Sequence, residues 1–341
     1  MIKITQDKIK DENFASSQHK NLMKAAVCTK YGLPEVLQVK DVEKPTPKDN
    51  EVLIRVYAAT ATLYDCWGRA ATGPPGFGLL IKLASGRKPK KPILGTEIAG
   101  EIESVGKDVN LFKKGDPVFG FTGMNLGANA EYVSMPEDGA VAIKPVNMTY
   151  EEAAAIPYGG LTALYFLRMG KIQSGHKVLI FGASGGVGTF AVQLAKYYGV
   201  EVDGVCSTPK IELVRSLGAD KVFDYTKEDF TKSGEMYDII LDTIAKSPFS
   251  ASKRMLNEGG FYVFTTFGLG RAIRVFSSKQ AVSGLLEERA EDLVFLKELI
   301  EAGKLKAVID KRFPLEQAAE AHKYIESGQK KGQVVLTLDH I

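Results

Sequence analysis

The sequence predicts an α/β protein in which a doubly wound parallel sheet is inserted into a second, mostly β unit. Three observations lead to this fold class. Residues 24–150 read as short strands separated by turns, residues 177–265 alternate between strands and helices, and a further strand ends the chain. Alternating strands and helices favour a parallel sheet with helices on both faces. The final strand is most simply placed back in the first unit.

The chain of 341 residues is long enough for about two domains, each with its own core. We expect a flexible extension over 1–22, the first part of the β unit over 23–150, the parallel-sheet unit over 151–282 and a return to the β unit over 283–341. The extension is polar and lacks the continuous apolar stretch of a signal peptide.

The β unit is expected to be largely antiparallel, with partial barrel character. Its strand-like runs are MKAAVCT, EVLQVKDV, EVLIRVYAAT, EIAGEIESVG and EYVSM, and breakers such as YGLP, KPTPKDN and KKGDPVFG lie between them. Residues 72–92 make a long, basic loop that is rich in breakers. A solvated surface loop is the preferred interpretation, and a lid or a partner contact is the alternative.

The segment from Phe181 to Gly199 carries the strongest functional signal. The apolar run KVLIF ends in a cluster of glycines, and a long helical pattern follows at once. The first N–H groups of a helix and its positive end suit a pyrophosphate, and glycine lets the backbone approach it closely. The spacing is GxxGxxG rather than GxGxxG, and a plain glycine turn is the alternative. The pattern predicts a nucleotide-binding turn made of Gly182, Ala183, Ser184, Gly185, Gly186, Val187 and Gly188.

Strand and helix patterns alternate around this turn. EEAAAIPYGGLTALYFLRMG reads as a helical region with a glycine break, and PKIELVRSLG and ASKRMLNEGG read as later helices. VEVDGVCS, DKVFDY, YDIILDTI and GGFYVFTT read as strands. The closing segment contains two amphipathic helices, LLEERAEDLVFLKELIEAGKL and LEQAAEAHKYIESGQ, before the terminal strand QVVLTL.

The composition narrows the class of protein. A hydrophobic content of 45% and a charged content of 25% are ordinary for a soluble globular chain, and a net charge of +3 gives no reason to expect nucleic acid or a membrane as a partner. No apolar run approaches the roughly 18 residues of a membrane span. The cysteines Cys28, Cys66 and Cys206 form no closely spaced set, so we expect no disulfide framework and a reducing, cytoplasmic location.

These features together resemble the medium-chain dehydrogenase/reductase superfamily, and more closely its zinc-independent branch of quinone and enone reductases, the zeta-crystallin-like group. The resemblance covers the chain from Met23 onward. Its markers occur in the expected order: MKA, the DxxxR of Asp65 to Arg69, GTEIAG, KKGDPVFG, AAAIPYGGLTALYFL, GASGGVG and RSLGADKVFDY. It implies a Rossmann sheet inserted into a GroES-like catalytic domain.

The resemblance also implies that this chain lacks the catalytic zinc of other superfamily members. The ligand histidine of the family falls on Thr96, and the ligand cysteine falls near Thr62. Neither supplies the imidazole or thiolate that zinc prefers. Cys66 and Glu97 remain nearby, but two groups do not make a site. Without a Lewis acid, reduction of a quinone or a conjugated enone needs less help than reduction of a ketone.

Candidate catalytic and substrate-binding residues follow from the same resemblance. Thr62 and Tyr64 are the catalytic candidates, and Trp67 and Tyr158 are the candidates for substrate binding; Thr62, Tyr64 and Trp67 are expected in a loop. Tyr64 can donate a hydrogen bond to a developing oxyanion, and aromatic packing is the alternative. Many quinone reductases carry Asn at the position of Thr62 and Tyr at that of Trp67, which leaves the substrate open.

Three charged residues near this segment are interpreted as structural. Asp65 and Arg69 are four residues apart and can pair on a helical turn. Glu97 is interpreted as a buried carboxylate that holds the site together, in preference to an acid catalyst.

The end of the strand VEVDGVCS bears on the choice of cofactor. A carboxylate that binds the ribose of NAD is expected there, but Asp203 lies inside the strand and the end reads Cys206, Ser207, Thr208. The two hydroxyls can donate to a 2′-phosphate and Lys210 can supply charge, which favours NADPH over NADH. Further cofactor contacts implied by the resemblance are Thr162, Tyr225, Thr265, Phe267, Lys331 and Gly332.

The sequence thus predicts a zinc-independent, NADPH-dependent oxidoreductase that transfers hydride to a small-molecule quinone or α,β-unsaturated carbonyl. One alternative is an alcohol or aldehyde oxidoreductase of the same superfamily. The other is an NADPH-binding protein with a regulatory role. The resemblance implies a homodimer through the edge of the cofactor domain, where residues 261–278 supply apolar strand material.

Overall fold

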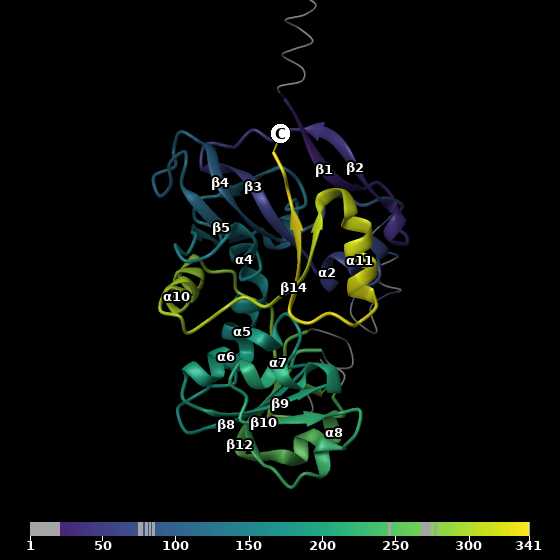
Figure 1. The fold of residues 1–341 in the computed structure, drawn as a ribbon, viewed down its shortest axis with the longest axis vertical. Helices are drawn as coiled ribbons and strands as arrows, with labels where there is room; N and C mark the ends of the chain where they lie inside the picture. The colour runs from purple at the N-terminus through teal and green to yellow at the C-terminus, as the bar shows by residue number, and fades with distance from the viewer. Residues whose placement is uncertain are drawn as a thin grey trace, which may run out of the picture.

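The computed structural model describes residues 21–73, 86–244, 247–266 and 278–340, together with residues 78, 81, 83, 274 and 275. All but the last two residues of the predicted extension lie outside this range, as does much of the basic loop. Two sheets form separate units that are stacked along the long axis of the molecule (Figure 1).

The lower unit in Figure 1 contains a six-stranded parallel sheet in the order β10-β9-β8-β11-β12-β13. Its strands are β8 (Lys177–Phe181), β9 (Glu201–Cys206), β10 (Lys221–Asp224), β11 (Tyr237–Asp242), β12 (Leu256–Phe264) and β13 (Ala281–Ser283). The strand order reverses between β8 and β11, and ligands of doubly wound sheets bind at the carboxyl ends of the strands at such a switch point. The predicted Rossmann sheet is confirmed.

Both faces of this sheet are buried, and β8 shows how. Val178 and Ile180 belong to one hydrophobic core, while Leu179 and Phe181 belong to the other. The first core is shared with α5 (Pro157–Met169), α6 (Gly188–Tyr197) and α7 (Ile211–Ser216), and α8 (Phe249–Ser252) packs on the second through Phe249. A strand buried on both faces reads as a continuous apolar run, as KVLIF does.

The upper unit is built on a seven-stranded sheet in the order β14-β15-β3-β4-β5-β7, with β6 paired to β3. These strands are β3 (Glu51–Ala61), β4 (Glu97–Val105), β5 (Pro117–Phe121), β6 (Tyr132–Pro136), β7 (Val141–Ile143), β14 (Ile309–Pro314) and β15 (Gln333–Thr337). All pairs are antiparallel except β14 with β15. The terminal strand β15 pairs with β3, so the chain returns to the first unit as predicted.

The remaining elements surround this sheet. A separate hairpin consists of β1 (Leu22–Cys28) and β2 (Leu37–Glu43). The helices are α2 (Leu63–Ala70), α4 (Tyr150–Ala154), α10 (Ala290–Glu301) and α11 (Ala318–Glu326). Short 3₁₀ turns occur at Pro34–Val36, Gly123–Asn125, Thr208–Lys210, Phe230–Lys232, Lys253–Met255 and Leu315–Gln317. Helix α11 packs on α2, which joins the end of the chain to its first third (Figure 1).

Some predicted boundaries are wrong where tertiary packing overrides local patterns. The breaker KKGDPVFG contains β5, because Val118 and Phe119 are buried and pair with β4. The helix predicted over ASKRMLNEGG ends by Met255, because Leu256 already pairs with Tyr237 of β11. Helix α10 begins at Ala290 rather than at the start of LLEERAEDLVF, and residues 284–289 have no regular structure.

The helical region over residues 151–170 does break, but at Ala155–Ile156 and before Pro157 rather than at its glycines. Gly159 and Gly160 lie inside α5, where close packing requires them. A Cβ at Gly159 would lie 2.6 Å from the carbonyl oxygen of Gly186, and one at Gly160 would lie 2.8 Å from Leu296. The glycines therefore let α5 approach its neighbours.

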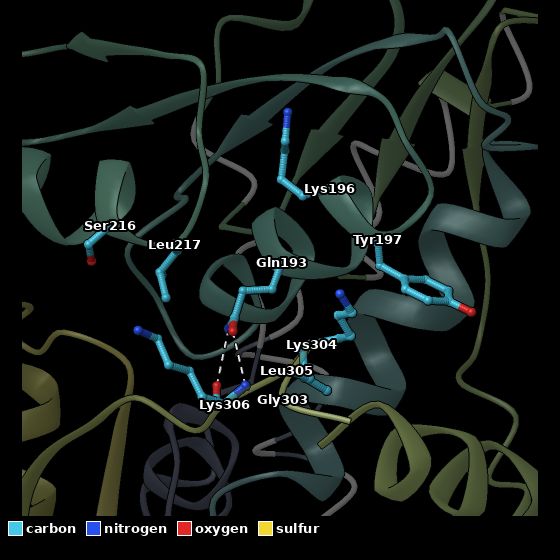
Figure 2. Close-up of a pocket in the computed structure, with 9 residues that line it drawn as sticks. All are labelled: Gln193, Lys196, Tyr197, Ser216, Leu217, Gly303, Lys304, Leu305 and Lys306. Atoms are coloured by element: carbon cyan, nitrogen blue, oxygen red, sulfur yellow. Dashed lines mark hydrogen bonds between the residues drawn. The ribbon is translucent and has the colours of Figure 1, made fainter. Parts of the chain in front are cut away.

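Gln193 of α6 connects the segment that follows α10 to the parallel-sheet unit through hydrogen bonds (Figure 2). Its Nε2 donates to the carbonyl oxygens of Thr189 at 2.9 Å and Lys306 at 3.1 Å, and its Oε1 accepts from the Lys306 N–H at 3.0 Å. The side chain is 6% exposed, so its loss leaves backbone groups of Lys306 without these partners.

We expect Gln193→Ala to lower the free energy of unfolding by about 1–3 kcal/mol, measured by urea titration. The control is Lys306→Ala, because Gln193 contacts only the backbone of Lys306 and the lysine side chain is exposed. That control should change stability by no more than about 0.5 kcal/mol. Equal losses in the two variants would contradict the proposed fastening role.

Candidate functional site

The glycine turn lies between β8 and α6, at the switch point of the parallel sheet. Gly182 has a φ of +83°, which disfavours side chains, and a Cβ on Gly188 would collide with the carbonyl oxygen of Gly182. The N-cap of α6 is Val187, and no side chain caps this end of the helix. The turn therefore presents a helix N-terminus that suits a phosphate group.

The C-terminal turn meets the glycine turn directly. The Gly332 N–H donates to the carbonyl oxygen of Ser184 at 2.9 Å, and Gly185 and Gly332 form a parallel bridge. Gln333, which is 2% exposed, donates from Nε2 to the carbonyl oxygen of Gly186 at 3.4 Å. The structure therefore brings the predicted residue Gly332, and Lys331 before it, to the predicted phosphate-binding turn.

The predicted residues at the end of β9 face a carboxylate that sequence reasoning missed. Asp224 ends β10 in register with Cys206. The hydroxyls of Thr208 and Thr226 both donate to its carboxylate, and these hydrogen bonds lower the pKa of Asp224. The Thr208 proton is thus already donated to an anion, which weakens the prediction that it donates to a 2′-phosphate.

Cationic side chains gather at the same end of the sheet. Lys210 donates from Nζ to the carbonyl oxygens of Lys330 at 2.9 Å and Gly328 at 3.5 Å. Burial lowers the pKa of Lys210, the charge of Asp310 acts in the opposite direction, and the charge of Lys331 makes a smaller contribution that lowers it. The Tyr225 side chain beside them is 53% exposed. The two lysines can attract an anionic ligand, and the carboxylate of Asp310 beside them opposes this attraction.

The other predicted cofactor contacts are distributed as follows. Thr162 lies in α5 and is 2% exposed, and its hydroxyl has no hydrogen-bond partner. A buried hydroxyl without a partner is costly, so it suits a polar ligand group. Thr265 follows β12 and donates to the carbonyl oxygen of Asp242 at 3.4 Å. Phe267 lies outside the described residues.

The predicted catalytic segment is a helix, not the expected loop. Thr62 is the N-cap of α2, and its Oγ1 donates to Asp65 at 2.6 Å and accepts from the Asp65 N–H at 3.2 Å. The pattern Thr-x-x-Asp is a capping box, which is the sequence signal for this helix. The Thr62 hydroxyl is buried and committed to the cap, so the geometry disfavours Thr62 as a proton donor.

Asp65 and Arg69 do not pair with each other, contrary to the spacing argument. Asp65 accepts from the N–H groups of Thr62 at 2.8 Å and Gly95 at 2.9 Å, so it fixes the start of α2. Arg69 donates to the carbonyl oxygen of Gly32 at 2.7 Å and pairs with Glu326 of α11. Both side chains are buried and have structural roles, as predicted.

Glu97 is buried where the two units meet. One carboxylate oxygen accepts from the Thr60 hydroxyl, and the other accepts from the Tyr158 N–H at 2.7 Å, near the start of α5. Burial raises the pKa of Glu97 to about 7, although these two hydrogen bonds act in the opposite direction. The carboxyl group thus links β3, β4 and α5, as its structural interpretation requires.

Two phenols, those of Tyr158 and Tyr64, lie near each other on this side of the site. Burial raises the pKa of Tyr158 to about 12, and the charges of Glu97 and Tyr64 reinforce the shift. The Tyr158 ring stacks on Phe121 with centroids 5.8 Å apart. The Tyr64 hydroxyl donates to the Met124 thioether at 2.8 Å, and burial raises its pKa. Both phenols stay protonated at neutral pH and can donate.

Residues missed by sequence reasoning complete this side of the site. Glu288 packs against Gly123, and its charge contributes to the raised pKa of Tyr64. It lies in the irregular segment before α10, where no pattern marks it. Lys330 and Gln333 flank the predicted Lys331 and Gly332, and their proximity to the turn could have been inferred from that neighbourhood.

The residues present do not fit a catalytic zinc ion. Thr96 and Thr62 stand at the two ligand positions, and the Thr62 hydroxyl is bound to Asp65. Burial raises the pKa of Cys66 to about 12, so its thiol stays protonated. Among the described residues, no three His, Cys, Asp or Glu side chains gather as a metal site.

Two pockets, each of about 560 Å³, lie among the described residues. One lies beside α2 and includes Tyr64 and Trp67. The other lies at the ends of α6 and α7 (Figure 2). Its lysine side chains point in different directions, and the amide of Gln193 already has hydrogen-bond partners within the protein. Lysine near a helix C-terminus is explained by the helix dipole, so this second pocket carries no functional assignment.

Comparisons with known proteins agree with this architecture. The alcohol dehydrogenase GroES-like domain matches residues 48–145, and a zinc-binding dehydrogenase family matches residues 217–336. A 2-methylene-furan-3-one reductase of Solanum lycopersicum is 32% identical over 92% of this chain and 79% of its own length. A quinone-oxidoreductase homolog of Spinacia oleracea is 33% identical over 92% of this chain and 98% of its own.

A solved structure of the quinone oxidoreductase from Coxiella burnetii superposes with a TM-score of 0.84 at 32% identity, over 93% of this chain and all of that one. In the described part of this chain, no helix is long and apolar enough to cross a membrane.

The raised pKa of Glu97 predicts a pH dependence of stability. Its ordinary value is 4.5 and its value in the folded protein is about 7, so the folded state holds this proton more tightly than the unfolded state. Stability therefore falls as pH rises from 4.5 to about 7 and does not change further above that range.

Glu97→Gln removes the titration and retains a partner for each contact, because the amide oxygen accepts from the Tyr158 N–H and the amide NH₂ donates to the Thr60 hydroxyl, which reverses that hydrogen bond. We expect wild type to lose about 3 kcal/mol relative to this variant across that pH range, measured by urea unfolding at each pH. Glu212→Gln, at an exposed glutamate of α7, is the control and should track wild type. Parallel curves for wild type and Glu97→Gln would refute the assignment.

Proposed function

This chain belongs to the quinone oxidoreductase-like branch of the medium-chain dehydrogenase/reductase superfamily, and we propose that it reduces a quinone or an α,β-unsaturated carbonyl with NADPH and without zinc. The observation that carries the proposal is the combination of a turn that suits a phosphate with two protonated phenols, Tyr64 and Tyr158, in a chain that has Thr62 and Thr96 at the family's zinc-ligand positions. The names of relatives, which include quinone oxidoreductases and an NADPH-dependent alkenal/one oxidoreductase, support the same reaction class.

The residues of this chain have distinct tasks in such a reaction. When bound, the nicotinamide cofactor supplies the hydride. Tyr64 donates a hydrogen bond to the substrate oxygen, where negative charge develops. Its present acceptor is a thioether, which is a weak one, so a carbonyl or enolate oxygen replaces it readily. Thr62 cannot do this without giving up its bond to Asp65, so we assign the donor role to Tyr64.

Besides the hydride, the substrate needs only such a hydrogen-bond donor and then a proton, which converts the enolate or hydroquinone anion to product, because conjugation already activates it. Tyr158 and Phe121 supply a flat aromatic wall, and Glu97 holds the backbone of Tyr158 in place. We propose Trp67 as a further contact of the substrate, since it lines the same pocket as Tyr64. In this proposal, neither the Cys66 thiol nor the Thr62 hydroxyl binds a metal ion.

The preference for NADPH rests on Lys210 and Lys331. Burial is the main cause that lowers the pKa of Lys210; the charge of Lys331 adds to it and Asp310 opposes it, and a 2′-phosphate would stabilise both lysines. Asp224 opposes the preference, but its charge is already engaged by two hydroxyls and lies 3.9 Å from Lys227. We propose that Lys210 and Lys331 outweigh Asp224 in the choice between the two cofactors.

We also propose that the chain forms a homodimer through the exposed edge of the parallel sheet, at β13, and acts in the cytoplasm. The three cysteines of the chain are all free and buried, as expected for a reducing compartment. Light scattering during size-exclusion chromatography tests the dimer. A mass equal to one chain would refute it.

Methyl vinyl ketone tests the reaction. We expect its saturated ketone as the product, and Tyr64→Phe should lower kcat by about 10- to 100-fold because one oxyanion donor is lost. Tyr197→Phe, at an exposed tyrosine of α6, is the control and should keep the wild-type kcat. Formation of only the allylic alcohol would favour the alcohol/aldehyde alternative. Tight NADPH binding without turnover of any enone or quinone would favour the regulatory one.

Cofactor choice is tested with Lys210→Met. We expect the ratio of KM for NADPH to KM for NADH to rise about 10- to 100-fold, because a charge-assisted hydrogen bond to the 2′-phosphate is lost. Lys210→Met also removes the hydrogen bonds to Gly328 and Lys330, and a looser turn there would change the KM of both cofactors. The ratio of the two KM values cancels this shared effect. Lys304→Met is the control, since this exposed lysine lies in the pocket of Figure 2. An unchanged ratio would overturn the assignment.

A further inference from the structure

The pocket beside α2 has the character of a site for an apolar chain. Its volume is about 560 Å³, within the range of small-molecule sites. Its walls include Tyr31, Tyr64, Trp67, Leu94, Met124 and Leu126. These side chains are aromatic, aliphatic or thioether groups, so the pocket favours a ligand part that has little need for hydrogen bonds.

Two polar groups of the pocket are already engaged, and a third, Lys90, is exposed to solvent at its edge. Asp65 lines it, but its carboxylate accepts from Thr62 and Gly95. Lys91 also lines it, and its Nζ donates to the carbonyl oxygen of Met124 at 2.9 Å and to Asn125 at 3.3 Å. Neither group requires a polar ligand as a partner.

Tyr64 connects this pocket to the reaction site. It lines the pocket with its hydrogen-bond partner Met124, and it lies close enough to Tyr158 to contribute to the raised pKa of that phenol. A substrate whose carbonyl accepts from the Tyr64 hydroxyl therefore has the pocket directly beside that carbonyl. Continuity with the site identifies the occupant as part of the substrate rather than a separate molecule.

We propose that the pocket beside α2 binds an apolar alkyl tail of the substrate, so that the chain prefers enones or quinones with a tail of several carbons. The proposal rests on the proposed function and adds the substrate class to it. Trp67 forms one wall of the tail site, and Gly68 leaves space for the tail next to Leu94.

Gly68 provides a direct test of this space. It lines the pocket, and a Cβ there would make an ordinary contact of 3.6 Å with Leu94. Gly68→Leu should therefore fold and fill the pocket, and Gly68→Ala should fill less of it. Glycine is unfavourable inside a helix, so neither change weakens α2 by helix propensity.

The first experiment uses alkyl vinyl ketones from methyl to pentyl with NADPH. In wild type, kcat/KM should rise about two- to fourfold for each added methylene until the pocket is full. Gly68→Leu should flatten this rise, and Gly68→Ala should give an intermediate slope. Ser216→Leu fills the unassigned pocket of similar volume and should keep the wild-type slope. Turnover with no dependence on chain length in wild type would overturn the tail site and leave the proposed function intact.

The second experiment does not depend on catalysis. Trp67 is the single tryptophan of the chain, so its fluorescence reports on the pocket. Titration with the saturated counterparts, from ethyl methyl ketone to ethyl pentyl ketone, should give a Kd that falls about two- to fourfold per methylene. Gly68→Leu should abolish this trend. A Kd independent of chain length, or emission that never responds, would overturn the proposal even if no enone were turned over.

Discussion

The close approach of three segments at the glycine turn is the constraint on which the rest of the structure depends. A Cβ at Gly159 would lie 2.6 Å from the carbonyl oxygen of Gly186, and one at Gly186 would lie 2.8 Å from the side chain of Gln333. Helix α5, the turn and strand β15 therefore meet only because glycine stands at the contacts. Any side chain there would separate the parallel-sheet unit from the returning chain, and with it the phosphate site from Gly332.

The same approach organises the reaction side of the molecule. Because α5 is held against the turn, its first residues face β4, and the Tyr158 N–H reaches Glu97. Glu97 in turn binds Thr60 of β3, so a single buried carboxyl group ties the cofactor side to the substrate side. Its raised pKa is the cost of that placement, since burial disfavours the charged form more than two hydrogen bonds favour it.

The two positions at which the family's zinc ligands fall are occupied here by Thr62, whose hydroxyl binds Asp65, and by Thr96. Thr62 and Asp65 form a helix cap, and Cys66 is a buried, protonated thiol. The polar groups left for a substrate are the phenols of Tyr64 and Tyr158, which donate hydrogen bonds but do not act as Lewis acids. This arrangement suits an acceptor that conjugation has already activated. The apolar pocket beside Tyr64 then provides a basis for selecting among such acceptors.

The sequence alone determined the fold class and the glycine turn, because hydrophobic periodicity and glycine spacing are local properties of the chain, whereas the order of the strands in each sheet came from the structure. It also contained the Thr-x-x-Asp cap of α2, although the segment was expected to be a loop. Tertiary structure alone decided the partners of Arg69, the carboxylate of Asp224 beside Thr208, and the position of Glu288 near Tyr64. These contacts join residues from separate elements, and in a folded chain such pairings follow from packing rather than from spacing. For the same reason, only the structure could show that Thr62 is committed to a cap while Tyr64 keeps a proton to donate.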